Sequence, residues 1–388
     1  MSWVDLVRRW VPAPVRYAVQ RVVPATELKL RHRRRTNPLA GVEASDDNPA
    51  GSPIRFGIIR NASQYHAHYV RACLDLGVPF RVLDLSQSDW LTAVERSGCD
   101  VLLVWPDAFL SIWGRMVKDR VEVLERHLGY PVFPSSAEIW MYEDKSRTAY
   151  WLQAHGIPHP TTWVLYDRAE AERRAATCDL PVVVKTSFGA ASAGVRIVRS
   201  RRRLRRMVDR AFTRGYFPSG GDPRDRQWGS ILLQEYLPDI REWRMVRIGD
   251  SYFGHPKGRV GDYHSGSGLV EWGAPQPRHL DLLHEVTTCG RFRSMDVDVF
   301  ETSDGTLLVN ELQAVFGASF SVDQLKVGGT AGRFIRLGRG SWRFEPGDFA
   351  RNACADERIR DVLARGLGRR QCGGGRPAVD AESWNTGP

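Results

Sequence analysis

The chain has 388 residues, 42% of them hydrophobic and 26% charged, so it can bury two or three cores, and wholesale disorder is excluded. Lysine and arginine exceed aspartate and glutamate by 55 to 45, yet residues 1–35 alone carry nine basic and two acidic side chains. The rest of the chain is nearly neutral. This asymmetry argues against a protein that binds nucleic acid over its whole surface and favours an enzyme-like body with a basic arm.

The cysteines are scattered and form no C-x-x-C pair, so they indicate neither a zinc ribbon nor a disulfide framework. No stretch approaches the eighteen or so apolar residues of a membrane span, and the N-terminus lacks the apolar core of a secretory signal. We therefore expect a cytoplasmic protein.

Residues 1–50 are predicted to form a basic amphipathic arm and a linker. Two apolar stripes have helical spacing, and the basic cluster Arg31 to Arg35 follows them. The stripes are Trp3, Leu6, Val7 and Trp10, and Val15, Ala18, Val19, Val22 and Val23. Two interpretations stay open: residues 1–35 lie on the anionic inner face of a membrane, or the arm packs on its own domain or a partner. Residues 41–52, small, acidic and rich in turn formers, are predicted to be a linker.

Residues 51–135 show the pattern of a small parallel α/β domain. Strands are expected over 54–59, 79–85 and 101–105, with a helix over 66–76 after the first strand. Beyond residue 136 the pattern becomes α+β, with a helix over 145–155 followed by several strands. We assign 136–340 to a second domain, with a middle lobe to about 212 and a C-terminal lobe after it, and 341–388 to an extension and flexible tail. The arginine run 199–206 indicates a solvated helix face, because no interleaved aromatic side chains offer base stacking.

A glycine-rich loop after a strand lysine is the most informative motif. A β-branched strand ends at Lys185, and the loop that follows carries Ser187, Gly189, Ser192 and Gly194. Such a loop can close backbone amides over phosphate oxygens while the lysine adds a point charge. The lysine precedes the loop, so this is no Walker-type P-loop, and an ordinary hairpin turn is the alternative explanation.

A second motif is an acidic hairpin over residues 295–317. Two apolar strands flank the turn at Ser303 to Gly305, which predicts that Asp298 and Glu311 face each other, with Gln313 on the face of Glu311. Two carboxylates and an amide oxygen suit Mg²⁺, whereas solvated surface acids are the alternative.

Residues 231–259 lie between these motifs and offer groups for a nucleotide. The backbone beside Gln234, Glu235 and Leu237 is a suitable edge for adenine, and Glu242 and Arg244 share one strand face as an acceptor and a phosphate donor. Lys257 and Arg259 add positive charge.

In order, these motifs resemble the ATP-grasp superfamily, and most of all the RimK-like carboxylate-amine ligases. The resemblance covers roughly residues 54–340 and rests on five motifs in the family's order. They are Asp144 and Lys145 before a helix that ends at Gly156, Ile157 and Pro158; Lys185 with its loop; Gln234 to Leu237; Glu242, Arg244 and Lys257; and Asp298 with Glu311 and Gln313.

The resemblance implies an ATP-grasp fold with a small α/β domain before it, and an enzyme that uses ATP and two Mg²⁺ ions. The implied reaction activates a carboxylate as an acylphosphate, which an amine attacks to give an amide; both substrates are small molecules or peptides. Lys145 and Lys185 would bind the phosphates, and the metal would be bound by Asp298, Glu311 and Gln313. Arg244, with Lys257 or Arg259, would stabilise the charge that develops on the acylphosphate.

The sequence also departs from the family pattern. Gln313 stands in place of asparagine, Glu242 in place of aspartate, Val315 and Phe316 in place of Pro-Gly, and Gly266 in place of a substrate-loop asparagine. Two other functions stay open: a phosphotransferase acting on a small-molecule hydroxyl, as in the inositol phosphate kinases, and a non-catalytic membrane-associated scaffold. The acid, the amine and the oligomeric state are not indicated.

Overall fold

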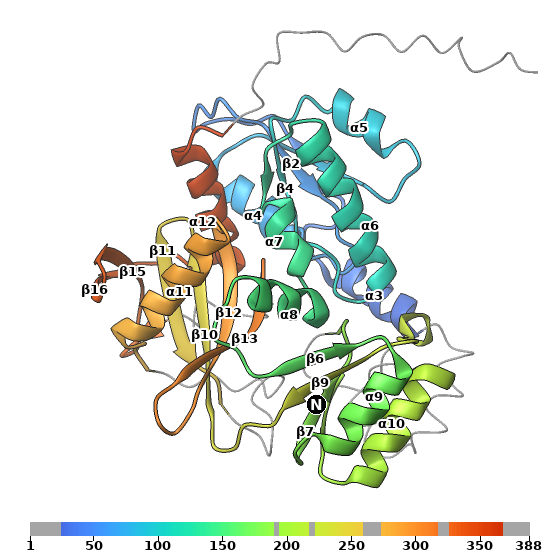
Figure 1. The fold of residues 1–388 in the computed structure, drawn as a ribbon. Helices are drawn as coiled ribbons and strands as arrows, with labels where there is room; N and C mark the ends of the chain where they lie inside the picture. Colours follow the sequence, from blue (N-terminus) through green and yellow to red (C-terminus); the bar gives the residue numbers. More distant parts are fainter. Residues whose placement is uncertain (1–24, 190–193, 217–221, 259–272, 317–325, 368–388) are drawn as a thin grey trace, which may run out of the picture.

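The computed structural model describes residues 25–189, 194–216, 222–258, 273–316 and 326–367, and within these ranges the strands form three sheets. Each sheet belongs to a separate layer of the molecule: an N-terminal α/β domain, a middle lobe and a C-terminal lobe (Figure 1). The predicted combination of α/β and α+β architecture is therefore confirmed. None of the helices in the described ranges combines the length and the apolar composition needed to cross a lipid bilayer.

The N-terminal domain is built on a five-stranded sheet in the order β1-β3-β2-β4-β5. Its strands are β1 (Ala44–Ser45), β2 (Phe56–Ile59), β3 (Phe80–Leu83), β4 (Val101–Leu103) and β5 (Val132–Phe133). Strands β2 to β5 run parallel, and most of their apolar residues are buried on both faces, as expected where helices cover a parallel sheet. The helices of this domain are α4 (Ala67–Leu76), α5 (Trp90–Arg96) and α6 (Ser111–Glu122), which continues into one π-helical turn (Val123–His127).

The middle lobe is a four-stranded antiparallel sheet in the order β6-β9-β7-β8. It consists of β6 (Thr162–Leu165), β7 (Val182–Lys185), β8 (Val195–Val198) and β9 (Ile231–Glu235). Helices α9 (Arg168–Thr177) and α10 (Arg201–Thr213) lie side by side on the sheet (Figure 1). The short 3₁₀ turn η2 (Pro223–Asp225) precedes β9.

The C-terminal lobe is a larger antiparallel sheet in the order β13-β12-β10-β11-β15-β14, with β16 paired to β15. Its strands are β10 (Arg241–Ile248), β11 (Ser251–Pro256), β12 (Ser294–Glu301), β13 (Leu307–Gln313), β14 (Lys326–Val327), β15 (Thr330–Gly338) and β16 (Ser341–Pro346). Three helices accompany it: α7 (Ser136–Met141), α8 (Lys145–Ala154) and α11 (Pro277–Cys289). Side chains alternate between the two faces of each strand, so β10 and β12 bury Trp243, Met245, Val297 and Val299 on one face and leave acidic and basic residues on the other.

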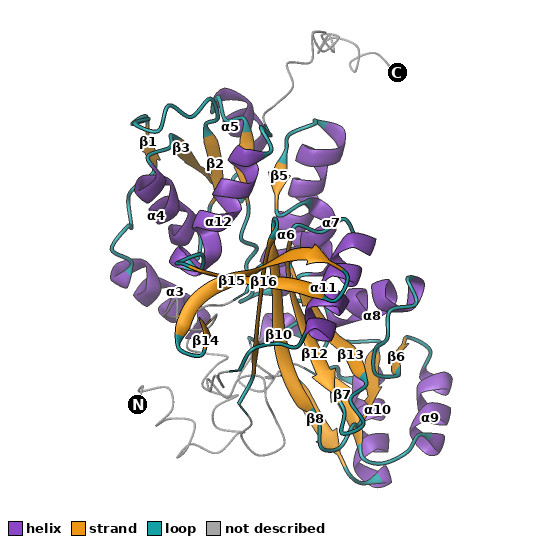
Figure 2. Cartoon of the chain, turned by 90° about the vertical axis from the view of Figure 1, so that its left-hand side faces the viewer, coloured by secondary structure: helices purple, strands orange, loops and turns teal. Residues whose placement is uncertain are grey.

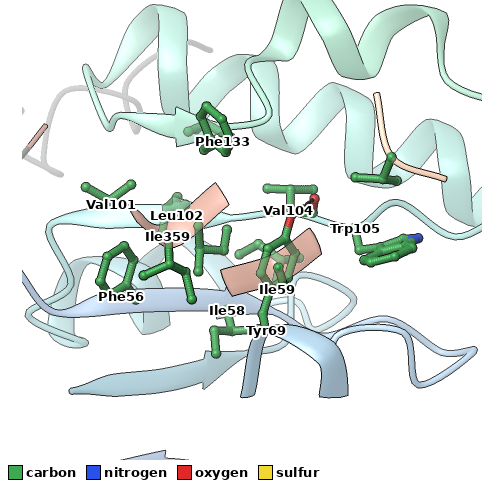
Figure 3. Close-up of a cluster of buried hydrophobic side chains, with 14 of the residues drawn as sticks. Phe56, Ile58, Ile59, Tyr69, Val101, Leu102, Val104, Trp105, Phe133 and Ile359 are labelled. Carbon is green, nitrogen blue, oxygen red and sulfur yellow. Dashed lines mark hydrogen bonds between the residues drawn. The ribbon is translucent and has the colours of Figure 1, made fainter. Parts of the chain in front are cut away.

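Two helices from the ends of the described chain lie against the N-terminal domain. Helix α3 (Ala25–Thr36) follows the outer edge of the molecule below α4, and α12 (Arg351–Ala364) packs against α4 (Figure 2). Ile359 of α12 belongs to the same apolar cluster as Ile58 and Leu102 (Figure 3). The N-terminal domain therefore completes its core with a helix from the far end of the sequence.

Three predicted boundaries differ from the structure. The expected linker over 41–52 contains β1, which pairs with β3, and Asp46 forms ion pairs with Arg55 and Arg81. The middle lobe does not end near 212, because β9 lies between β6 and β7 in its sheet. Nor is 341–388 a separate extension, since β16 pairs with β15.

Candidate functional site

The predicted site residues that the structure describes come from elements that meet between the middle and C-terminal lobes. They lie at the end of β7 and in the loop after it, at the end of β9, at the N-terminus of α8, just after β11, and on the charged face of β10, β12 and β13. Of the predicted residues, Ser192 and Arg259 lie outside the described ranges, as does Gly266.

Lys145 is the first residue of α8, and its position is set by the helix cap. The Asp144 side chain accepts a hydrogen bond from the Arg147 amide at 3.1 Å, which fixes where the helix begins. Lys145 Nζ then reaches the carbonyl oxygen of Gly189 at 2.7 Å and the Glu311 carboxylate at 3.2 Å. This one side chain joins the glycine-rich loop to the acidic hairpin.

Charge governs the protonation of this pair. Burial alone would lower the pKa of Lys145, but the negative charges of Glu311 and Glu143 outweigh burial, and its pKa is raised. Burial would raise the pKa of Glu311, but Lys145 and Lys185 prevail and lower it to about 2. Both groups are therefore charged at neutral pH.

Lys185 ends β7 and differs in its protonation. Its Nζ donates to Oδ1 of Asn310 at 2.9 Å, and the residue is only 7% exposed. Burial lowers the pKa of Lys185 to about 8, against the attraction of Glu311. The Lys185 ammonium therefore loses its proton more readily than an ordinary lysine does.

A β-bulge in the acidic hairpin explains how the consecutive residues Asn310 and Glu311 contact two different lysines. The register passes from Asp298 opposite Glu311 to Val299 opposite Val309, so Asn310 is an extra residue with no partner across the hairpin. In a regular strand Asn310 and Glu311 would point to opposite faces. Here Asn310 binds Lys185 while Glu311 binds Lys145.

The glycine-rich loop is anchored at both ends. The Lys145 amide donates to the carbonyl of Ser187 at 2.8 Å, and the Thr186 amide donates to the carbonyl of Gly194 at 3.0 Å. A Cβ atom at Gly194 would lie 1.7 Å from the Thr186 hydroxyl, so only glycine fits at this closure. The described ends of the loop are thus fixed beside both lysines.

Arg244 and Asp298 lie on the charged face of β10 and β12, and Lys257, just after β11, reaches the same face. Lys257 Nζ lies 2.7 Å from the Glu242 carboxylate and also contacts Asp298, and Arg244 Nε lies 3.1 Å from Asp296 and 3.7 Å from Asp298. The register confirms that Asp298 lies opposite Glu311. Glu242, predicted as a nucleotide acceptor, shares the face of Arg244 and binds Lys257.

The carboxylates of this face are under strong desolvation. Burial raises the pKa of Asp296 to about 7 and raises that of Asp298, against the opposing charges of Arg244 and Lys257. Both oxygens of Asp296 and one oxygen of Asp298 are buried without a hydrogen bond in the described structure. Unsatisfied buried carboxylate oxygens favour binding of a cation or donor at this point.

The donor set can be tested against Mg²⁺. Asp298 and Glu311 face each other and supply carboxylate oxygens, the hard ligands that Mg²⁺ prefers, and Asp298 has an oxygen with no hydrogen bond. Gln313 donates from Nε2 to Glu311 at 2.8 Å, and its Oε1 accepts from the Glu143 amide at 2.9 Å. The described residues contain no cluster of three His, Cys, Asp or Glu side chains that could hold a metal. A metal here would rely on two carboxylates and an amide, as the sequence predicts.

A small pocket lies beside the two lysines. Lys145, Lys185, Gln234 and Asn310 line its polar side, and Leu152, Leu232 and Val309 are among its apolar lining residues. Gln234 donates to the Thr162 hydroxyl at 3.0 Å, and Glu235 accepts from the Thr161 amide at 2.6 Å. These bonds fix the end of β9, and Leu237 follows just beyond it, half-buried.

Sequence reasoning missed three residues of this region. Asp296 precedes Asp298 by two positions, and the two-residue period of a strand would have placed it on the same face. Asn310 could be found only from the bulge, which leaves no sequence signal. Glu143 is buried with a positive φ of 50°, and burial raises its pKa to about 7, ahead of the opposing charge of Lys145.

Comparison with known proteins establishes the fold. No family model matches the chain. One curated relative, the small subunit of 2-oxoglutarate carboxylase from Hydrogenobacter thermophilus, is 28% identical over 111 residues, or 28% of this chain. The match spans 22% of that relative's length.

Three solved structures resemble most of the chain. N5-carboxyaminoimidazole ribonucleotide synthetase in an ADP complex has a TM-score of 0.54 and 16% identity, covering 82% of this chain and 79% of that chain. D-cycloserine synthetase has a TM-score of 0.54 and 15% identity, covering 80% of this chain and 99% of that chain. The biotin carboxylase domain of the Hydrogenobacter thermophilus 2-oxoglutarate carboxylase has a TM-score of 0.50 and 16% identity, covering 68% and 64%. The chain therefore has the ATP-grasp fold, and the predicted fold is confirmed.

Proposed function

We propose that the chain is an ATP-dependent ligase that joins a carboxylate to an amine, as its resemblance to RimK-like enzymes predicts. One observation carries the proposal: Lys145 and Lys185 border a pocket, and Lys145 also pairs with Glu311, which faces Asp298. Cations for phosphate oxygens and carboxylates for Mg²⁺ thus converge on one point. Three solved neighbours have names or bound ligands consistent with this use: an ADP-bound ribonucleotide synthetase, a D-cycloserine synthetase, and a biotin carboxylase domain with MgADP.

In this proposal each group has a place along the nucleotide. Gln234 and the backbone from Glu235 to Leu237 border the adenine end, while Lys145, Lys185 and the loop with Ser187, Gly189, Ser192 and Gly194 hold the phosphates. Asp298, Glu311 and Gln313 would hold Mg²⁺, which neutralises phosphate charge when bound.

The proposed chemistry has two steps. A substrate carboxylate oxygen attacks the γ-phosphorus of ATP and ADP leaves, giving an acylphosphate. The amine nitrogen then attacks the carbonyl carbon, phosphate leaves with the electron pair of the broken C–O bond, and the nitrogen loses a proton. Arg244 and Lys257, with Arg259, stabilise the negative charge near the transferred phosphoryl group, so catalysis is mainly electrostatic. To accept a substrate, these cations must exchange part of their present pairing with Asp296, Asp298 and Glu242.

Product analysis tests the proposal. Purified protein with ATP and MgCl₂ is screened against carboxylic acids and amines, and ADP and phosphate are measured. A ligase releases phosphate only when an acid and an amine are both present, and hydroxylamine in place of the amine traps the acylphosphate as a hydroxamate. A phosphorylated hydroxyl without phosphate release would show a phosphotransferase instead, and ATP binding without any turnover would indicate the scaffold. The Lys185→Met protein serves as the inactive control.

A further inference from the structure

Helix α3 is attached to the N-terminal domain along one face. The Arg33 guanidinium lies 5.0 Å from the ring centres of Tyr65 and Phe109, and its Nη1 donates to the carbonyl of Ser63 at 3.3 Å. Lys29 Nζ lies 4.6 Å from the centre of the Phe109 ring. These cation–π contacts fix the orientation of the helix on the body.

The start of α3 also reaches the middle lobe. The Thr26 hydroxyl donates to Asp222 at 2.6 Å, and Glu27 forms an ion pair with Arg224 at 2.7 Å. Helix α3 therefore contacts two parts of the body at once and is held in place, unlike a freely moving tether.

The opposite face of α3 is basic and exposed. At 100° per residue, Leu28, Arg31, His32 and Arg35 cluster on the side away from Thr26 and Arg33, and all four are exposed. Arg34 beside them is exposed as well. Within the described part of the chain, no acidic group pairs with Arg31, Arg34 or Arg35. Arginines in the last turn of a helix also stabilise it by interacting with the helix dipole. That interaction does not explain why Leu28 is exposed on the same face.

The sequence that leads into this helix supplies apolar anchors. Residues 1–24 lie outside the described ranges, and they contain the two apolar stripes, including Trp3 and Trp10. Tryptophan prefers the boundary between lipid and water, and short apolar segments bind membranes firmly when basic residues add attraction to anionic lipid. A nucleic acid could pair with the arginines but has no apolar region to bury the apolar stripes. Basic and apolar side chains together therefore favour a bilayer over a polyanion in solution.

We propose that the outer face of α3, with Arg31, Arg34 and Arg35, binds the surface of an anionic lipid bilayer. This binding is independent of the proposed ligase activity. Since α3 is bonded to the body, the bilayer holds the enzyme in one orientation.

Vesicle cosedimentation of the full-length protein tests the proposal. Vesicles contain phosphatidylcholine alone or with about one-third phosphatidylglycerol, at low and high salt. Wild-type protein should pellet with anionic vesicles only and be released by salt. The triple variant Arg31→Gln, Arg34→Gln, Arg35→Gln should bind on the order of a hundredfold more weakly, since each basic residue contributes about 1 kcal/mol near such a surface.

A matched variant separates position from net charge. Arg202→Gln, Arg203→Gln and Arg205→Gln remove the same charge from exposed positions on α10 and should leave binding unchanged. Trp3→Ala with Trp10→Ala keeps every charge and should weaken binding to anionic vesicles at low salt. Thermal unfolding checks that each variant folds.

Three results would overturn the proposal. The first is wild-type protein that does not bind anionic vesicles. The second is equal loss of binding in the α3 and α10 variants. The third is α3-dependent binding to a labelled DNA or RNA duplex, by fluorescence anisotropy, without binding to vesicles. Each outcome leaves the ligase assay unaffected.

Discussion

Lys185 of the middle lobe donates a hydrogen bond to Asn310 of the C-terminal lobe, with 2.9 Å between Nζ and Oδ1. The two residues are 125 positions apart, and each lines the pocket between the lobes. A nucleotide phosphate placed here would compete with Asn310 for the same ammonium. The bond thus holds the lysine in the position in which we propose that it acts.

Replacing Lys185 by methionine should weaken ADP binding by about ten- to a hundredfold, because a hydrogen bond to a charged group contributes about 1.5–3 kcal/mol. Isothermal titration with ADP and MgCl₂ measures this. Lys185→Arg keeps the charge and should retain more of the affinity than methionine does. Unchanged affinity in the methionine variant would show that the loop beside Lys185 holds no phosphate.

Nucleotide binding should take up a proton near pH 8. Burial lowers the pKa of Lys185 to about 8, so a large fraction of this lysine is neutral at pH 8.5, and a phosphate beside it would restore the charged form. Titration of ADP in buffers with different ionisation enthalpies measures the uptake, which should fall toward zero at pH 6.5, where the lysine is already charged. The Lys185→Arg protein should show a smaller uptake, because arginine stays protonated throughout.

The same pKa predicts a trend in stability. The folded-state value lies below the ordinary value of 10.5, so the unfolded chain binds more protons between about pH 8 and 10.5. The contribution of Lys185 to the free energy of unfolding should therefore rise as pH increases across this window. The difference in denaturation midpoint between wild type and Lys185→Met measures it, and a difference that is independent of pH would contradict the lowered pKa.

Glu311→Gln should remove turnover and abolish the dependence of nucleotide binding on Mg²⁺. The variant keeps the size of the side chain and loses the charge that faces Asp298 and pairs with Lys145. ADP titrations with and without MgCl₂ give the dependence directly. Glu285→Gln, an exposed change on α11, is the control and should behave as wild type. A normal response to Mg²⁺ in Glu311→Gln would exclude the hairpin as the metal site.

Arg358→Ala should lower the free energy of unfolding by about 2–4 kcal/mol. The residue is 1% exposed, donates to the Ser294 hydroxyl and the Ala353 carbonyl at 2.9 Å each, and lies over the rings of Trp105 and Phe316. Arg360→Ala on the same helix removes an exposed guanidinium and should cost less than about 0.5 kcal/mol. Urea denaturation followed by circular dichroism compares the two, and equal losses would contradict a stabilising role for Arg358.

Local patterns predicted most elements and much of the candidate site. The turn at Ser303 to Gly305 predicted that Asp298 lies opposite Glu311, and helical spacing predicted the helix that begins at Lys145. Both depend on neighbours in sequence. Long-range pairing could not be predicted this way, and so β9 was assigned to the wrong lobe. The bulge at Asn310 could not be predicted either, because it is defined only by the register with the partner strand.

The contact of α12 with α4 has a consequence for how the chain is made. Asn352 donates to Asp75 at 3.1 Å, a pairing across 277 positions, and Ile359 enters the core around Ile58. During synthesis, the N-terminal domain emerges from the ribosome long before α12 has been made. The apolar surface of α4 that α12 covers therefore stays exposed until then. Nascent chains that stop before residue 351 should bind chaperones through this surface, and release should follow completion of α12.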